Sequence, residues 1–338
     1  MSLEFDPAAL RRWCDRQFGP ADTPPEITRI SGGQSNPTFY VTHGDRRLVL
    51  RKQPPGPLLK GAHAVDREFR VLRALADTEV PVPEALAFEP DAALLGTPFY
   101  VMARLEGRVC PTYALPELAP ADRGPALRDM ARTLGRLHAV RPDAVGLGDY
   151  GRPGDYFQRQ MSRWSRQYAA SAADPIPELD ALRDWLSAAM PEDDGAVAIA
   201  HGDFRMGNMM LHPTAPRVIA VLDWELSTLG HPLADLGFAC MAWHSAPEEY
   251  GGILGLDLAA EALPRMDAFV AAYHETAPVT APLRPFHVAF AMFRFAVIFV
   301  GIADRAAAGS AADRDAADLA PLARAFARRG LAVTDLSF

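Results

Sequence analysis

The sequence has few cysteines, no long run of basic residues and no recognisable secretion signal. Its 338 residues include three widely separated cysteines, Cys14, Cys110 and Cys240. Such a set predicts neither a disulfide framework nor a zinc site. The net charge of −8 and the lack of a basic cluster argue against nucleic acid as the main partner. Residues 1–6 lack the basic and apolar regions of a signal peptide, and the scattered cysteines suit a reduced, cytoplasmic setting, which we expect for this protein.

Long apolar runs are also scarce. The longest one, Phe286 to Ala303, contains His287 and Arg294. A buried helix explains this run better than a membrane span, and we expect no membrane partner. Arg294 needs a polar partner there, either a protein carboxylate or a substrate anion. With 49% apolar residues, a chain of this length suits two lobes or domains.

The most informative stretch is His-Gly-Asp-Phe-Arg-Met-Gly-Asn at residues 201–208. Residues 209–222 read as two strands joined by a turn, which would bring Asp203, Asn208 and Asp223 together. Phosphoryl transfer from a nucleotide needs this set. One carboxylate orients the acceptor hydroxyl and takes its proton, while a carboxamide and a second carboxylate hold magnesium. The Asp-x4-Asn spacing matches the catalytic loop of protein kinases.

The tripeptide His-Gly-Asp occurs a second time, which provides a control for the motif. His43–Asp45 lies between two β-type runs, Thr38–Thr42 and Arg46–Arg51. A glycine-centred triplet between such runs predicts a hairpin turn. Neither an Asn nor an Asp follows at the required spacing. The tripeptide alone is therefore weak evidence for a catalytic loop, and the candidate catalytic site is the second copy.

The second copy resembles the aminoglycoside phosphotransferase (choline-kinase-like) family, with His-Gly-Asp and Asp-Trp in place of the protein-kinase His-Arg-Asp and Asp-Phe-Gly. Two further runs, Leu48–Gly56 and Val221–Gly230, resemble a subgroup of that family. Members of this subgroup are kinase-like domains fused to, or encoded beside, acyl-CoA dehydrogenases. The resemblance covers roughly residues 25 to 305.

The resemblance implies a two-lobed, kinase-like α+β fold. A small lobe, residues 1–104, would hold an antiparallel sheet and its helix. A larger helical lobe, residues 105–338, would carry the catalytic loop and the substrate pocket. Small residues between two predicted strands allow backbone N–H groups to approach phosphate oxygens closely. This loop, which would cover the nucleotide, contains Gly32, Gly33, Ser35 and Asn36.

Kinase-like folds place a cation on the third strand to hold the α- and β-phosphates, backed by a helix carboxylate. Strand alternation puts Arg51 and Lys52 on opposite faces. Arg51 aligns better with the usual lysine, and Lys52 is the alternative. The resemblance makes Glu68, in a predicted helix from about residue 62 to 77, the partner of this cation. It also places the hinge that binds adenine at Ala103 and Leu105.

The resemblance implies transfer of the γ-phosphoryl group of ATP to a hydroxyl of a small molecule, with magnesium. Asp203 would be the base, and Asn208 and Asp223 the metal ligands. The subgroup suggests a hydroxyacyl-CoA acceptor. Residues 149–168 are rich in arginine and aromatics, which suits an anionic substrate. Alternatives are an aminoglycoside, a choline-type substrate, or a non-catalytic nucleotide-binding module. Asp235 would support the catalytic loop.

Overall fold

The computed structural model describes most of the chain, in seven segments: residues 5–30, 36–56, 63–172, 174–279, 281–307, 319–336 and 338. The chain forms two compact units. Unit 1 contains Met1–Gly107 and Ala220–Glu225, and unit 2 contains Arg108–Ile219 and Leu226–Phe338. The predicted small lobe ended at residue 104 and did not include the short segment Ala220–Glu225, which carries Asp223 and belongs to unit 1.

Unit 1 contains an antiparallel sheet of five strands in the order β1-β2-β3-β5-β4. The strands are β1 Glu26–Arg29, β2 Thr38–His43, β3 Arg46–Lys52, β4 Ala85–Glu89 and β5 Phe99–Ala103, and the helices are α1 Pro7–Phe18, α2 Val65–Leu75 and α3 Ala92–Leu95. The first His-Gly-Asp copy joins β2 to β3, with Gly44 at a φ of +57°. The prediction of a hairpin turn there is confirmed.

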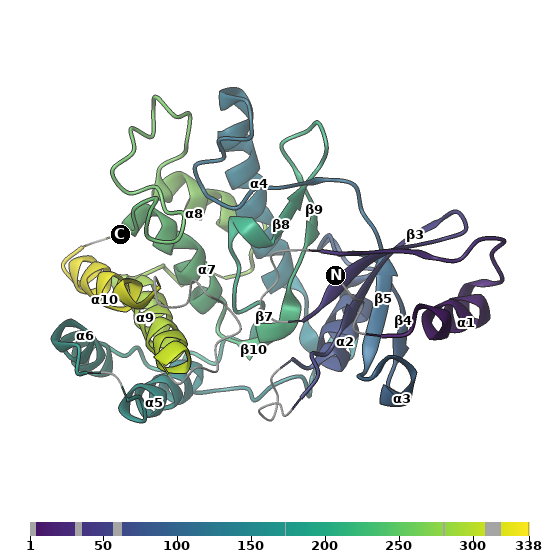
Figure 1. Cartoon of the computed structure of the whole chain (residues 1–338). Helices are drawn as coiled ribbons and strands as arrows, with labels where there is room; N and C mark the ends of the chain where they lie inside the picture. Colours follow the sequence, from purple (N-terminus) through teal and green to yellow (C-terminus); the bar gives the residue numbers. More distant parts are fainter. Residues whose placement is uncertain are drawn as a thin grey trace. The chain divides into compact units, whose positions relative to one another are not determined.

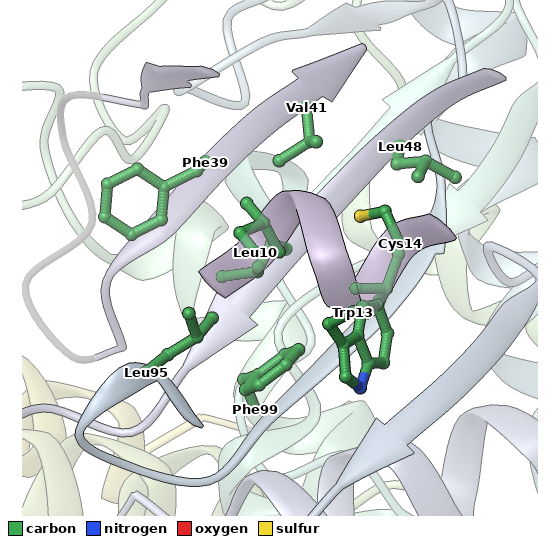
Figure 2. Packing of buried hydrophobic residues seen from close by; sticks show 10 residues of the cluster. Leu10, Trp13, Cys14, Phe39, Val41, Leu48, Leu95 and Phe99 are labelled. Carbon is green, nitrogen blue, oxygen red and sulfur yellow. The ribbon is translucent and has the colours of Figure 1, made fainter. Parts of the chain in front are cut away.

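The two faces of this sheet carry different chemistry because side chains alternate along each strand. One face packs against α1, where Leu10 and Trp13 meet Leu48 and Phe99 in a buried core (Figure 2). The Asp6 carboxylate caps α1 by accepting hydrogen bonds from the backbone N–H groups of Ala8 and Ala9. The other face is covered by α2, whose Phe69 stacks on Phe88 and contacts Tyr100 at a tilt. Arg51 lies on this second face.

Unit 2 is mainly helical, with two small sheets of order β6-β8-β9 and β10-β7. Its helices are α4 Pro120–Ala139, α5 Tyr156–Ala169, α6 Pro177–Ala188, α7 Pro232–Cys240, α8 Met266–His274, α9 Pro285–Ala307 and α10 Ala320–Thr334. Its strands are β6 Arg108–Val109, β7 Ala198–Ala200, β8 Met209–Leu211, β9 Val218–Val221, which continues into unit 1, and β10 Thr228–Gly230. Short 3-10 turns are η1 Pro142–Val145, η2 Met206–Asn208, η3 Trp224–Leu226 and η4 Met241–His244.

The central element of unit 2 is α9, which runs beside α10 (Figure 1). It is the one helix among the described residues that is long and apolar enough to cross a membrane. Within unit 2, however, 72% of its most apolar stretch is buried. The prediction of a buried core helix for this run is confirmed.

Candidate active site

The catalytic loop follows β7 and is held by a buried carboxylate. The backbone N–H groups of His201 and Gly202 donate to the two oxygens of Asp235, over 2.6 and 2.9 Å. Burial by itself raises the pKa of this carboxyl, but the His138 side chain and the Gly202 N–H lower the pKa by more. Asp235, at the start of α7, is therefore ionised at neutral pH and fixes the loop backbone, as the family resemblance implied.

A second contact holds the backbone of the same loop. The Arg294 guanidinium donates to the Gly202 carbonyl oxygen over 2.6 Å. Gly202 has a φ of +83°, and a Cβ there would lie 2.6 Å from the Leu226 carbonyl oxygen, so only glycine fits. This backbone oxygen is the hydrogen-bond partner of Arg294 in the described part of the chain, where the sequence had left a carboxylate or an anion open.

Asp203 and Asn208 form a hydrogen-bonded pair across the η2 turn. The Asn208 amide nitrogen donates to the Asp203 carbonyl oxygen and to its Oδ2, each over 2.8 Å. The side-chain Oδ1 of Asn208 receives no hydrogen bond from the described residues. Because magnesium prefers oxygen ligands, this atom fits the predicted metal-binding role. The arrangement orients Asp203 while leaving an oxygen ligand available.

In unit 1, a second charged cluster surrounds Arg51. Its Nε lies 2.7 Å from Glu68 Oε2, and its Nη2 donates to Asp223 Oδ1 over 2.6 Å. Burial would lower the pKa of Arg51, but Glu68 and Asp223 raise it by more, so the guanidinium stays charged. Asp223 adopts a φ of +63°, which is uncommon for a residue with a side chain and often found at functional sites.

Glu68 also accepts hydrogen bonds from Asn36 Nδ2 over 2.6 Å and from the Tyr100 hydroxyl over 3.0 Å. Asn36 is 2% exposed, and its Oδ1 contacts His63. The Asn36 side chain thus holds Glu68, while the phosphate-covering role predicted for the backbone of its loop stays a prediction. The other predicted loop residues, Gly32, Gly33 and Ser35, lie outside the described residues.

Lys52, the alternative phosphate-binding cation, lies on the α1 face of β3. It is 1% exposed, and its Nζ donates to the Leu95 carbonyl oxygen over 2.9 Å. This buried position corrects the prediction that Lys52 is a candidate nucleotide ligand. Adjacent strand residues face opposite sides, so only one of the two cations can share a face with Glu68.

The predicted hinge follows β5. Ala103 pairs with Leu48, and its N–H donates to the Glu84 carbonyl oxygen over 2.8 Å, so this N–H is already bonded. The N–H of Leu105 makes no hydrogen bond within the described residues. Adenine recognition at these two positions stays a prediction. The two predicted metal ligands, Asn208 and Asp223, belong to different units.

A cavity that is partly open to solvent lies in unit 2 next to the catalytic loop. Its wall is mostly aromatic and apolar, and Arg205 is the one charged side chain among its described lining residues. Arg205 Nε lies 3.4 Å from Asp203 Oδ2, and its guanidinium covers the Tyr250 ring at 5.2 Å. The sequence analysis did not single out either residue. Arg205 lies within the catalytic motif, and this position is the sequence signal that could have identified it as a site residue.

Comparison with known proteins identifies the family. The family model described as "Phosphotransferase enzyme family" matches residues 26–286. The chain belongs to this family. It is therefore a kinase-like phosphotransferase, and the family resemblance noted from the sequence is confirmed.

Relatives more than 35% identical to this phosphotransferase include a solved structure and a curated protein. A solved structure of a candidate aminoglycoside phosphotransferase from Ralstonia eutropha is 42% identical, with a TM-score of 0.87 over 98% of both chains. The acyl-CoA dehydrogenase family member 11 of Gallus gallus is 39% identical over 99% of this chain and 44% of its own length. The chain thus spans less than half of that curated relative.

A more distant solved structure extends the fold comparison. Aminoglycoside phosphotransferase APH(4)-Ia, in complex with AMP-PNP and hygromycin B, is 17% identical, with a TM-score of 0.62 over 95% of this chain and 98% of its own. At that identity the likeness concerns the fold. The predicted two-lobed, kinase-like α+β fold is confirmed.

Proposed function

We propose that this phosphotransferase moves the γ-phosphoryl group of ATP to a hydroxyl of a small molecule. The observation that carries the proposal is the Asp203–Asn208 pair on a loop whose backbone is held by Asp235. A carboxylate fixed in this way can align an acceptor hydroxyl and take its proton as the new P–O bond forms. Most of the rate enhancement would come from this positioning.

The remaining residues have supporting roles. Asn208 and Asp223 would hold magnesium, which neutralises charge on the transferring phosphoryl group when bound. Arg51 would contact the nucleotide phosphates while Glu68 holds its guanidinium, since both oxygens of Glu68 already have partners. The AMP-PNP complex of the distant family member with the same fold supports nucleotide binding.

The acceptor we propose is a hydroxyacyl-CoA thioester. Two observations support this class. The cavity beside Asp203 has no acidic side chain among its described lining residues, although a polycationic aminoglycoside would need one. The relatives that carry this domain are also named as acyl-CoA dehydrogenase family members.

The test is magnesium-dependent ADP release from ATP across a panel of acceptors, namely hydroxyacyl-CoA thioesters, choline, aminoglycosides and simple sugars. We expect a hydroxyacyl thioester to stimulate release in the natural protein and Asp203→Asn to abolish the stimulation. Asp45→Asn is the matched control, because it makes the same change in the exposed His-Gly-Asp turn.

The outcomes of this test distinguish the role of Asp203, the class of the acceptor and a non-catalytic module. Equal loss of activity in both variants would contradict the role of Asp203. Stimulation by another acceptor alone would keep the reaction and reject the thioester. Nucleotide binding without release for any acceptor would favour a non-catalytic module.

A further inference from the structure

The cavity beside the catalytic loop has the composition of a site for an apolar group. Five of its lining residues are aromatic: Tyr113, Phe238, Tyr250, Phe295 and Phe326. It resembles small-molecule sites in combining an apolar wall with a few polar groups. The polar groups here include the Arg205 guanidinium at one side.

Arg205 connects this cavity to the reacting centre. Its guanidinium lines the cavity and also lies 3.4 Å from Asp203 Oδ2. The Arg205 side chain is 29% exposed, so it can reach a ligand without leaving Asp203. A ligand in the cavity would therefore meet a hydrogen-bond donor at the place where its hydroxyl meets the catalytic carboxylate.

The wall formed by residues 245–252 is held in one shape. Tyr250 has a φ of +75° and packs edge-on against Phe295, with ring centroids 4.9 Å apart. A Cβ at Gly252 would lie only 2.0 Å from the Ser245 carbonyl oxygen. Glu249 is bound by the Arg329 guanidinium of α10 through contacts of 2.9 and 3.1 Å. A wall fixed in this way can discriminate ligands by size.

We propose that this cavity binds the hydrocarbon tail of the acceptor beyond its hydroxyl and so sets the preferred acyl chain length. The inference rests on the proposed function and specifies it further. Each methylene group buried in the cavity should raise kcat/KM by about fourfold. This factor is the free energy gained when one methylene group leaves water, converted into a ratio of rates. The gain should stop once the tail fills the space, because overpacking is unfavourable.

The experiment compares hydroxyacyl-CoA thioesters in which the hydroxyl keeps its position relative to the carbonyl and the tail beyond it grows by one methylene at a time. The same series is offered as free hydroxy acids, since both share the hydroxylated chain. Two variants change the cavity in opposite directions. Ala242→Leu enlarges a wall side chain and so makes the cavity smaller, whereas Met241→Ala shortens a wall side chain and makes the cavity larger. Ala188→Leu, on the exposed end of α6, is the control.

We expect kcat/KM to rise with tail length to an optimum in the natural protein. Ala242→Leu should move this optimum to shorter tails and Met241→Ala to longer ones, with the KM for ATP unchanged. Ala188→Leu should leave it in place. An optimum that stays the same in a variant with normal thermal unfolding would overturn the inference while leaving the proposed function intact. Failure of the natural protein to phosphorylate any member would instead overturn the proposed acceptor.

Discussion

Arg51→Met would leave the Glu68 carboxylate buried without its cation. The Glu68 side chain is 1% exposed and that of Arg51 is 15% exposed, and the two charges are 2.7 Å apart. Removing one partner of a buried pair typically costs about 3–5 kcal/mol of folding free energy, because the remaining charge keeps its desolvation penalty. The Asn36 and Tyr100 donors compensate part of this cost, so we expect about 3 kcal/mol.

Urea unfolding at neutral pH measures this loss directly. A matched control lies on the same strand. Arg47 contacts Glu106 at 2.8 Å, but the two side chains are 64% and 58% exposed, so Arg47→Met should cost about 0–1 kcal/mol. The double variant Arg51→Met/Glu68→Gln should regain most of the lost stability, since no buried charge is left alone. Equal, small losses for Arg51→Met and Arg47→Met would refute the reasoning.

Two further predictions concern buried groups. Lys52→Met should leave the KM for ATP and the rate of ADP release unchanged, because the Lys52 ammonium contacts the Leu95 carbonyl on the α1 face; a large rise in that KM would contradict its assignment to the core. His287 is buried, and desolvation lowers its pKa to about 3. The unfolded chain therefore binds a proton below about pH 6.5 that the folded chain does not, and stability should fall by up to about 1.4 kcal/mol per pH unit between pH 6.5 and 3. The decline in urea-unfolding free energy over this range should be smaller in His287→Gln, and an unchanged slope would be inconsistent with a neutral His287.

Several features could be predicted because they depend on neighbours within a few residues. The His43–Asp45 turn followed from two β-type runs around a glycine, and the structure places Gly44 at the required positive φ. The Asp203–Asn208 pair follows from the spacing within one turn, where the backbone itself brings the two side chains together. The placement of Arg51 and Lys52 on opposite faces follows from the two-residue repeat of a strand.

Other features of the site could not be predicted, since they join residues far apart in the chain. Arg294 reaches the Gly202 carbonyl across 92 positions, and nothing in its own helix indicates a backbone partner. Asn36 ends a glycine-rich loop, and nothing in that loop indicates that its side-chain amide donates to a carboxylate in α2. Short polar side chains have several possible partners, and the packing of the surrounding elements selects one.

The sequence by itself indicated the family and the kinase-like fold, through the resemblance carried by residues 48–56, 201–208 and 221–230. The spacing within these motifs also set the order of the candidate catalytic residues. Only the tertiary structure decided which cation shares a face with Glu68 and what lies beside Asp203. The cavity is built from the catalytic loop, the segment between β6 and α4, α7, η4 with residues 245–252, α9 and α10, and its described lining runs from Pro111 to Phe326 along the chain. Its shape depends on how these segments pack against one another, and no local pattern encodes that packing.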